Sequence, residues 1–199
     1  MPGKFVTFEG GEGAGKTTVL ALVAQELKDR GWSVLTTREP GAGEVGAAIR
    51  QLLLHSGEIP PTTELLLFLA DRSNHVETII KPALAKGTVV LCDRFVDSTT
   101  VYQAHVRGLD ASFIQAGNRF ATSGLVPDRT YLLDVPVEIG LARAKGGDRL
   151  DAMPAEFHEK VREGFLKLAQ QDPARWRTLD ASQSASSVAS AIIEDLTSL

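Results

Sequence analysis

The sequence predicts a three-layer α/β domain, in which helices cover both faces of a central parallel sheet of about five strands. Short apolar runs, partly β-branched, alternate with longer segments of helical periodicity, and this alternation is typical of βαβ units with a buried parallel sheet. The strands are expected at residues 5–8, 34–37, 88–92, 131–133 and 176–179. A chain of 199 residues forms one sizeable core, and its composition does not shift along its length, so we expect a single domain over residues 1–199.

Apolar spacing also predicts the helices between and after these strands. Apolar residues recur at helical spacing from Leu20 to Leu27, ahead of Gly31, which is placed to end a helix. Residues 64–85 carry a dense apolar face behind two prolines and predict one long or broken helix. A last helix is expected at about residues 187–196, where the preceding serines predict an N-terminal capping region.

The charge and cysteine content exclude several classes of protein. With 21 Lys and Arg against 25 Asp and Glu the net charge is −4, which argues against a nucleic-acid binder that works through a basic surface. The single cysteine, Cys92, lies in an apolar strand, so it predicts a core residue and leaves neither a disulfide nor a cysteine-rich zinc site. The longest stretch without Asp, Glu, Lys or Arg, residues 181–193, falls short of the roughly 18 apolar residues that a membrane span needs. We therefore expect no membrane partner and, since the N-terminus lacks the apolar core of a signal peptide, a cytoplasmic protein.

The sharpest motif matches G-x-x-x-x-G-K-[ST] and lies between the first strand and the first helix. Glycines let successive N–H groups point at phosphate oxygens, and the helix beginning near Lys16 adds the positive end of its dipole. Lys16 is expected to reach the β and γ phosphates, and the Thr17 hydroxyl to coordinate Mg²⁺. The alternative is a flexible glycine-rich hairpin, whereas a dinucleotide-binding loop is disfavoured because Lys16 stands where its third glycine would be. The expected ATP-binding residues of this loop are Gly10, Gly11, Glu12, Gly13, Ala14, Gly15, Lys16, Thr17 and Thr18.

A second cluster follows the strand at residues 88–92. Asp93 stands at the carboxyl edge of the sheet, where a metal-linked carboxylate is usual, and Arg94 comes next. An arginine beside the metal site is expected where a second phosphate, that of an acceptor, must be bound in line with the γ-phosphate. The sequence lacks an Asn-Lys-x-Asp segment that would read guanine, so it favours a kinase over a switch GTPase or a hydrolytic ATPase.

Several ordered motifs together resemble the thymidylate (dTMP) kinases, a family of P-loop nucleoside-monophosphate kinases, over essentially the whole chain. The motifs are Phe8-Glu9-Gly10, Thr37-Arg38-Glu39-Pro40-Gly41, Phe68-Leu69-Ala70-Asp71-Arg72, Asp93-Arg94-Phe95-Val96-Asp97-Ser98, Val101-Tyr102-Gln103 and Asp148-Arg149-Leu150-Asp151. The resemblance implies a P-loop NTPase fold with a short lid at about residues 143–151. It also implies transfer of the γ-phosphoryl group of Mg-ATP to dTMP, a step in dTTP synthesis for DNA.

The resemblance assigns the acceptor site residue by residue. Arg38 leaves the second strand into a Pro-Gly turn and, with Arg94, is expected to clamp the acceptor phosphate, although position alone also allows a surface pair with Glu39 or Glu44. Phe68 and Arg72 share a helix face, and in the family the aromatic ring stacks on thymine while the arginine binds its carbonyl edge. Glu9 is expected near the metal and the acceptor. The full expected acceptor set is Arg38, Glu39, Phe68, Arg72, Arg94, Ser98, Thr99, Tyr102 and Gln103, with Tyr102 placed where it excludes a ribose 2′-hydroxyl.

The expected lid combines three cations with a pair of glycines. Because the P-loop carries Glu12 where an arginine could stand, the resemblance implies that the lid supplies the cation for the transferring phosphoryl group. Lys145 and Arg149 are the candidates for it, and Arg143 is expected to stack on adenine. A solvated basic loop is the alternative for each of them.

Other hypotheses remain open from the sequence. They are a kinase of another monophosphate or of a deoxynucleoside, and an ATP-binding regulatory module with poor turnover. The four histidines, His55, His75, His105 and His158, lack a metal-binding spacing and are interpreted as surface or helix-face residues. The resemblance also implies a homodimer.

Overall fold

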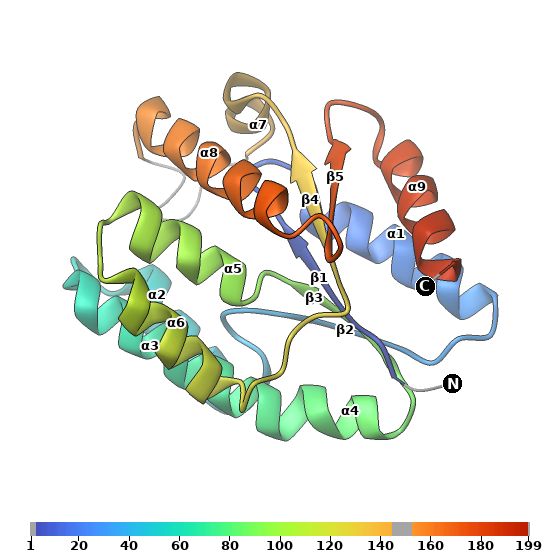
Figure 1. Ribbon diagram of the computed structural model, residues 1–199, viewed down its shortest axis with the longest axis horizontal. Helices are drawn as coiled ribbons and strands as arrows, with labels where there is room; N and C mark the ends of the chain where they lie inside the picture. The colour runs from blue at the N-terminus through green and yellow to red at the C-terminus, as the bar shows by residue number, and fades with distance from the viewer. Residues whose placement is uncertain (1–2, 145–152, 199) are drawn as a thin grey trace.

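The computed structural model describes residues 3–144 and 153–198 and has five parallel strands in one sheet, in the order β2-β3-β1-β4-β5 (Figure 1). The strands are β1 (Phe5–Glu9), β2 (Val34–Arg38), β3 (Val89–Asp93), β4 (Arg129–Asp134) and β5 (Trp176–Asp180). Each agrees with its sequence-based range to within two residues at either end, so the predicted fold class is confirmed.

Helices cover both faces of this sheet. α1 (Lys16–Asp29) and α9 (Ala185–Thr197) pack together on one face (Figure 1). The opposite face is covered by the π-helical turns η1 (Val76–Ile80) and η2 (Thr100–Val106) and by α8 (Ala155–Gln171). The remaining helices are α2 (Gly43–His55), α3 (Pro61–His75), α4 (Lys81–Ala85), α5 (Val96–Thr99), α6 (Ala111–Ala121) and α7 (Val137–Arg143). Within the described residues, none of the helices has the length and apolar character needed to cross a membrane.

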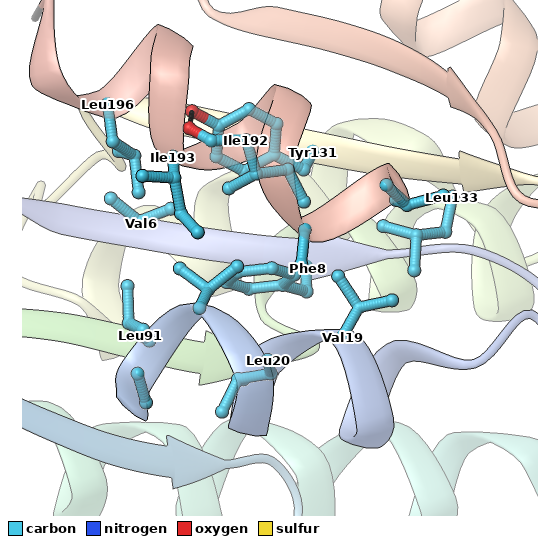
Figure 2. Close-up of a cluster of buried hydrophobic side chains, with 14 of the residues drawn as sticks. Val6, Phe8, Val19, Leu20, Leu91, Tyr131, Leu133, Ile192, Ile193 and Leu196 are labelled. Atoms are coloured by element: carbon cyan, nitrogen blue, oxygen red, sulfur yellow. Dashed lines mark hydrogen bonds between the residues drawn. The ribbon is translucent and has the colours of Figure 1, made fainter. Parts of the chain in front are cut away.

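The alternation of side chains along β1 divides the core into two parts. Val6 and Phe8 point into the cluster formed with α1 and α9, and Figure 2 shows Phe8 among side chains of both helices. Phe5 points to the other face, where its ring packs edge-on against Phe95 at 4.9 Å between centroids. Glu9 shares the parity of Phe5, so its side chain is directed to the face that carries α5.

The long helix expected at residues 64–85 is present but contains a change of winding. α3, η1 and α4 follow one another without an intervening loop, and the junction residues Val76 and Lys81 keep helical dihedral angles. The helix begins at Pro61, because proline suits a first turn. The π-helical turn ends two residues before Pro82, which has no N–H to donate to the preceding turn. At the other end of the chain the predicted serine cap is confirmed, since Ser184 Oγ accepts from the Ser187 N–H at 3.1 Å.

The strand order positions the functional site. β1 is central, with β2 and β3 on one side of it and β4 and β5 on the other, and the chain crosses between the two sides after β3, so the order of strands reverses there. Ligands of open parallel sheets bind in the crevice at the carboxyl ends of such strands. Glu9, Arg38 and Asp93 end β1, β2 and β3 at this common edge, and Arg38 pairs in register with Asp93.

Candidate active site

A cavity of about 380 Å³ opens at the carboxyl edge of the sheet. It brings together the phosphate loop, the end of β2, the middle of α3 and the turn after β3. The predicted residues that line it are Glu12, Gly13, Gly15, Lys16, Thr17, Thr18, Arg38, Glu39, Phe68, Arg72, Asp93, Arg94, Ser98, Thr99, Tyr102 and Gln103. Glu9 does not line this cavity.

The phosphate loop needs glycine for reasons of space as well as of backbone geometry. Gly13 has φ of 67°, and a Cβ placed on it would lie 1.8 Å from the carbonyl oxygen of Gly140 in α7. Gly10 has φ of 143°, and its Cβ would lie 2.6 Å from the Leu133 carbonyl oxygen in β4. The loop is therefore pressed against neighbouring backbone, which holds it in place at the start of α1.

Lys16 is buried inside this loop. Its Nζ donates to the carbonyl oxygens of Gly10 and Gly11 at 3.0 and 2.8 Å. Burial lowers the pKa of Lys16, and the nearby charge of Arg94 lowers it further. An anion placed in the loop would offer this ammonium a charged partner in place of two neutral carbonyls.

Thr17 and Asp93 form a pair that suits a divalent cation. The Thr17 hydroxyl donates to Asp93 Oδ2 at 2.9 Å, which joins the first turn of α1 to the end of β3. Asp93 Oδ1 is buried and, in the described part of the chain, has no hydrogen-bond partner. Hydroxyl and carboxylate oxygens are the ligands that Mg²⁺ prefers, so this pair fits the ion.

Arg94 lies at the centre of the cavity in a left-handed backbone conformation, with φ of 67°. Such a conformation is strained for a residue other than glycine and is found most often at functional sites. The guanidinium donates to Glu12 Oε1 at 2.6 Å and to the Gly10 carbonyl at 3.1 Å, and it lies 5.4 Å from the centre of the Tyr102 ring. Burial opposes ionisation of Glu12, but the charges of Arg94 and then Lys16 outweigh it and lower its pKa to about 2.

Glu9 ends β1, as expected, and does not line the cavity. Its carboxylate is fully buried and accepts from the Phe95 N–H at 2.8 Å and from the Ser98 hydroxyl at 2.6 Å. Burial, and next the charge of Asp97, raises its pKa to about 7. Both oxygens thus accept from the backbone and side chain of the turn that carries Arg94, and the expected role of Glu9 near a metal or acceptor stays a prediction.

The far end of the cavity combines an aromatic ring with a buried cation. Phe68 is half-buried on the cavity wall, one helical turn before Arg72 in α3. Arg72 is only 1% exposed, and its Nε donates to Glu39 Oε2 at 2.9 Å. Glu39 therefore holds Arg72, and the alternative in which it pairs with Arg38 is not observed; Arg38 is exposed on the cavity wall.

The α5–η2 side of the cavity carries the remaining predicted residues. The Tyr102 hydroxyl donates to Glu12 Oε1 at 3.1 Å. Gln103 Nε2 donates to Glu64 Oε1 at 2.8 Å, which fixes the orientation of that amide. Thr99 is buried, and the hydroxyl of the neighbouring Ser98 donates to Glu9.

Comparison with known proteins agrees with this geometry. The family model described as thymidylate kinase matches residues 8–192. A thymidylate kinase of Thermomicrobium roseum is 50% identical over 192 residues, covering 94% of this chain and 91% of that protein. The chain belongs to the thymidylate kinase family. The crystal structure of the thymidylate kinase from Ehrlichia chaffeensis aligns with a TM-score of 0.82 at 33% identity, covering 98% of this chain and 99% of that one.

The family's lid is only partly described. Lys145 and Arg149 lie outside the described residues, so their expected roles stay predictions. Arg143, the last residue of α7, donates to the carbonyl oxygens of Ala181 and Ser182 at 2.6 and 3.2 Å. Its guanidinium is thereby fixed against the loop between β5 and α9.

Several residues of the site were not predicted from the sequence. His75 and His158 lie on helices, which agrees with one of the two interpretations, but both are buried, so the surface alternative was wrong for them, because a helix position does not reveal what packs on it. His75 and Asn118 both contact the Glu39–Arg72 pair. Arg50 of α2 also lines the cavity and donates to the Pro40 carbonyl at 2.8 Å. The two motifs that contain Glu39 and Arg72 gave no signal for these distant partners.

Proposed function

We propose that the protein transfers the γ-phosphoryl group of ATP to dTMP in this cavity to give dTDP, a step in dTTP synthesis for DNA. Membership of the thymidylate kinase family supports this reaction. The observation that carries it is the continuity of one cavity from Lys16 and Thr17, through Arg38 and Arg94, to Phe68 and Arg72. Such a cavity would place the phosphate site, the acceptor-phosphate site and the base site next to one another.

The roles within the site follow from its charges. The loop N–H groups and Lys16 bind the β and γ phosphates, while Arg38 and Arg94 bind the acceptor phosphate, so that two anions are aligned despite their repulsion. Thr17 and Asp93 would hold Mg²⁺, which neutralises charge on the phosphates when bound. Arg94 touches both halves of the site and stabilises charge as it spreads during transfer. Lys145 or Arg149 would add a lid cation, and Arg143, held against residues 181–182, would face adenine.

The base end supports the choice of acceptor. Phe68 offers a ring face for stacking, and Arg72 offers donors to a carbonyl edge. Tyr102, fixed through Glu12, would stand beside the sugar and favour deoxyribose over ribose. The phosphate clamp of Arg38 and Arg94 disfavours a nucleoside acceptor, which has no phosphate to bind.

The reaction is tested by measuring ADP production from Mg-ATP with dTMP, dUMP, dCMP, dGMP, dAMP and thymidine in separate reactions. Strong turnover with dTMP and little with the others is the expected result. Preference for another acceptor would refute the assigned roles of Phe68, Arg72 and Tyr102 while keeping the phosphate site. Tight ATP binding without turnover on any of the six would favour a regulatory module instead.

We also propose a cytoplasmic homodimer, as the family resemblance implies. Phe113 and Phe120 lie seven residues apart on α6 and are 52% and 88% exposed, and Leu66 of α3 is 52% exposed. α6 packs on α3, where a Cβ on Gly117 would meet Leu69 at 2.8 Å, so these side chains belong to neighbouring helices. Sedimentation should show a dimer for the wild type and dissociation for Phe120→Glu. Leu22→Glu, on the opposite face of the sheet, should leave the dimer intact, and a monomeric wild type would refute the proposal.

A further inference from the structure

A buried chain of hydrogen bonds runs from the sheet edge to Arg72. Thr37 Oγ1 lies 2.7 Å from His75 Nε2, His75 Nδ1 lies 2.9 Å from Glu39 Oε1, and Glu39 Oε2 accepts from Arg72 Nε at 2.9 Å. Since a carboxylate only accepts, Nδ1 of His75 carries the proton that points at Glu39. His75 is 0% exposed, so water does not substitute for either of its partners.

The other edge of the same guanidinium is held by α6 and by the turn after β3. Arg72 Nη1 donates to Asn118 Oδ1 of α6 at 2.6 Å, and Nη2 donates to the Phe95 carbonyl at 3.1 Å. The guanidinium carbon also lies 5.4 Å from the centre of the Phe95 ring. Each of its three nitrogens is thus fixed, by groups from three separate segments of the chain.

These contacts decide which hydrogen-bonding groups remain for a ligand. A guanidinium has five N–H groups and no acceptor. The bonds to Glu39, Asn118 and Phe95 use one on each nitrogen, which leaves one N–H on Nη1 and one on Nη2. A base that presents a keto oxygen satisfies such donors, whereas a base that presents an amino group in the same place sets donor against donor.

We propose that His75, Glu39 and Asn118 are positioning residues that hold Arg72 in one orientation and thereby set the preference for a keto-bearing over an amino-bearing pyrimidine acceptor. The inference rests on the proposed function, because it needs Arg72 to face the base. Rotation of Arg72 would leave the Glu39 carboxylate buried without its cation, which is strongly unfavourable. The discrimination is therefore set by the groups that fix Arg72 as well as by Arg72 itself.

The test compares steady-state kinetics and the dissociation constants of dTMP and dCMP for His75→Leu, Asn118→Ala and Arg72→Ala. For His75→Leu and Asn118→Ala we expect KM for dTMP to rise about 5- to 30-fold, as for loss of a buried hydrogen bond. KM for ATP should change less than about twofold, and the preference for dTMP over dCMP should fall by about the same factor as dTMP affinity. His75→Asn, which keeps an N–H directed at Glu39, should recover part of the loss.

Tyr131→Phe is the matched control, because it removes a hydrogen bond of 2.7 Å to Asp195 on the far side of the sheet. It should lower Tm without changing either KM or the preference for dTMP. If His75→Leu and Asn118→Ala behave like this control, positioning is refuted even where Arg72→Ala raises KM for dTMP strongly. If Arg72→Ala itself leaves KM for dTMP unchanged, the base pocket of the proposed function is refuted, and this inference with it. Should His75→Leu fail to fold, Asn118→Ala and Thr37→Val give the same comparison.

Discussion

Nη2 of Arg94 lies 2.6 Å from Oε1 of Glu12, so the cation of the turn after β3 is paired with a carboxylate of the phosphate loop. Both side chains are 18% exposed, which places the pair between an exposed ion pair and a fully buried one. The pair joins the loop after β1 to the turn after β3 and occupies the cavity that the acceptor phosphate would enter.

This pair should stabilise the protein more than an exposed ion pair does. In a double-mutant cycle of Glu12→Gln and Arg94→Gln, urea unfolding should give a coupling free energy of about 1–3 kcal/mol. The exposed pair at the end of α1, in which Arg30 Nε lies 2.9 Å from Glu26 Oε1, should give a coupling free energy of only about 0.5 kcal/mol. Because the pKa of Glu12 is lowered to about 2, its contribution is present above its ordinary pKa and is lost as pH falls from there towards 2. Equal coupling in the two cycles would contradict this assignment.

Replacing Lys16 should abolish turnover while leaving the fold intact. Lys16 Nζ contacts only loop carbonyls among the hydrogen bonds of the described residues, so its loss removes no structural ion pair. Lys16→Ala should lower kcat by at least about 10²–10³-fold, since the transferring phosphoryl group loses a preorganised cation. Circular dichroism should be unchanged. Lys28→Ala, at an exposed position on the same helix, should retain wild-type kcat. Near-normal turnover of Lys16→Ala would refute the proposed role of Lys16 in phosphoryl transfer.

Metal dependence should be controlled by Asp93. Its Oδ2 accepts from Thr17 and its Oδ1 is buried without a partner among the described residues, so one oxygen is left to bind a cation directly or through water. In Asp93→Asn, the Mg²⁺ concentration for half-maximal turnover should rise about 10- to 100-fold. Asp29→Asn, at the exposed end of α1, serves as the control. An unchanged Mg²⁺ requirement for Asp93→Asn would remove this residue from the metal site.

Local patterns were sufficient for the sheet and the phosphate loop. Strand periodicity and the spacing of glycines with Lys16 are set within a few residues, so they predict both elements without knowledge of the rest of the fold. The partners of Arg72 were beyond such reasoning, because His75 and Glu39 lie 36 residues apart and Arg72 and Asn118 lie 46 apart. Only the packing of α3 against β2 and α6 brings them together.

The hydrogen-bond partners of Glu9 were also beyond such reasoning. Its place at the carboxyl end of β1 was predicted correctly, but the end of a strand does not fix which groups meet the side chain. The tight turn at Arg94 presents the Phe95 N–H and the Ser98 hydroxyl to that carboxylate. A buried acceptor is satisfied by the nearest donors, and here these belong to the turn.

A last prediction concerns the pH dependence of stability around Asp71, which is buried beside Glu39, Arg72 and His75. Its Oδ1 accepts from the Gly41 N–H at 3.1 Å, while Oδ2 has no partner within the described residues. Burial, and next the charge of Glu39, raises its pKa from 3.8 to about 6. The folded state therefore binds this proton more tightly than the unfolded state, so ionisation of Asp71 makes stability fall as pH rises from about 4 to about 6.

Replacing Asp71 with asparagine should remove the fall in stability between pH 4 and pH 6. The free energy of unfolding of the wild type, measured by urea at each pH, should decrease relative to that of Asp71→Asn between pH 4 and pH 6 and run parallel to it above. Asp110 is the contrasting control, because its exposed carboxylate caps α6 and the Ser112 hydroxyl lowers its pKa. The wild type should therefore lose stability relative to Asp110→Asn as pH falls, which is the opposite direction. Parallel profiles of the wild type and Asp71→Asn over the whole range would show that Asp71 does not titrate in this environment.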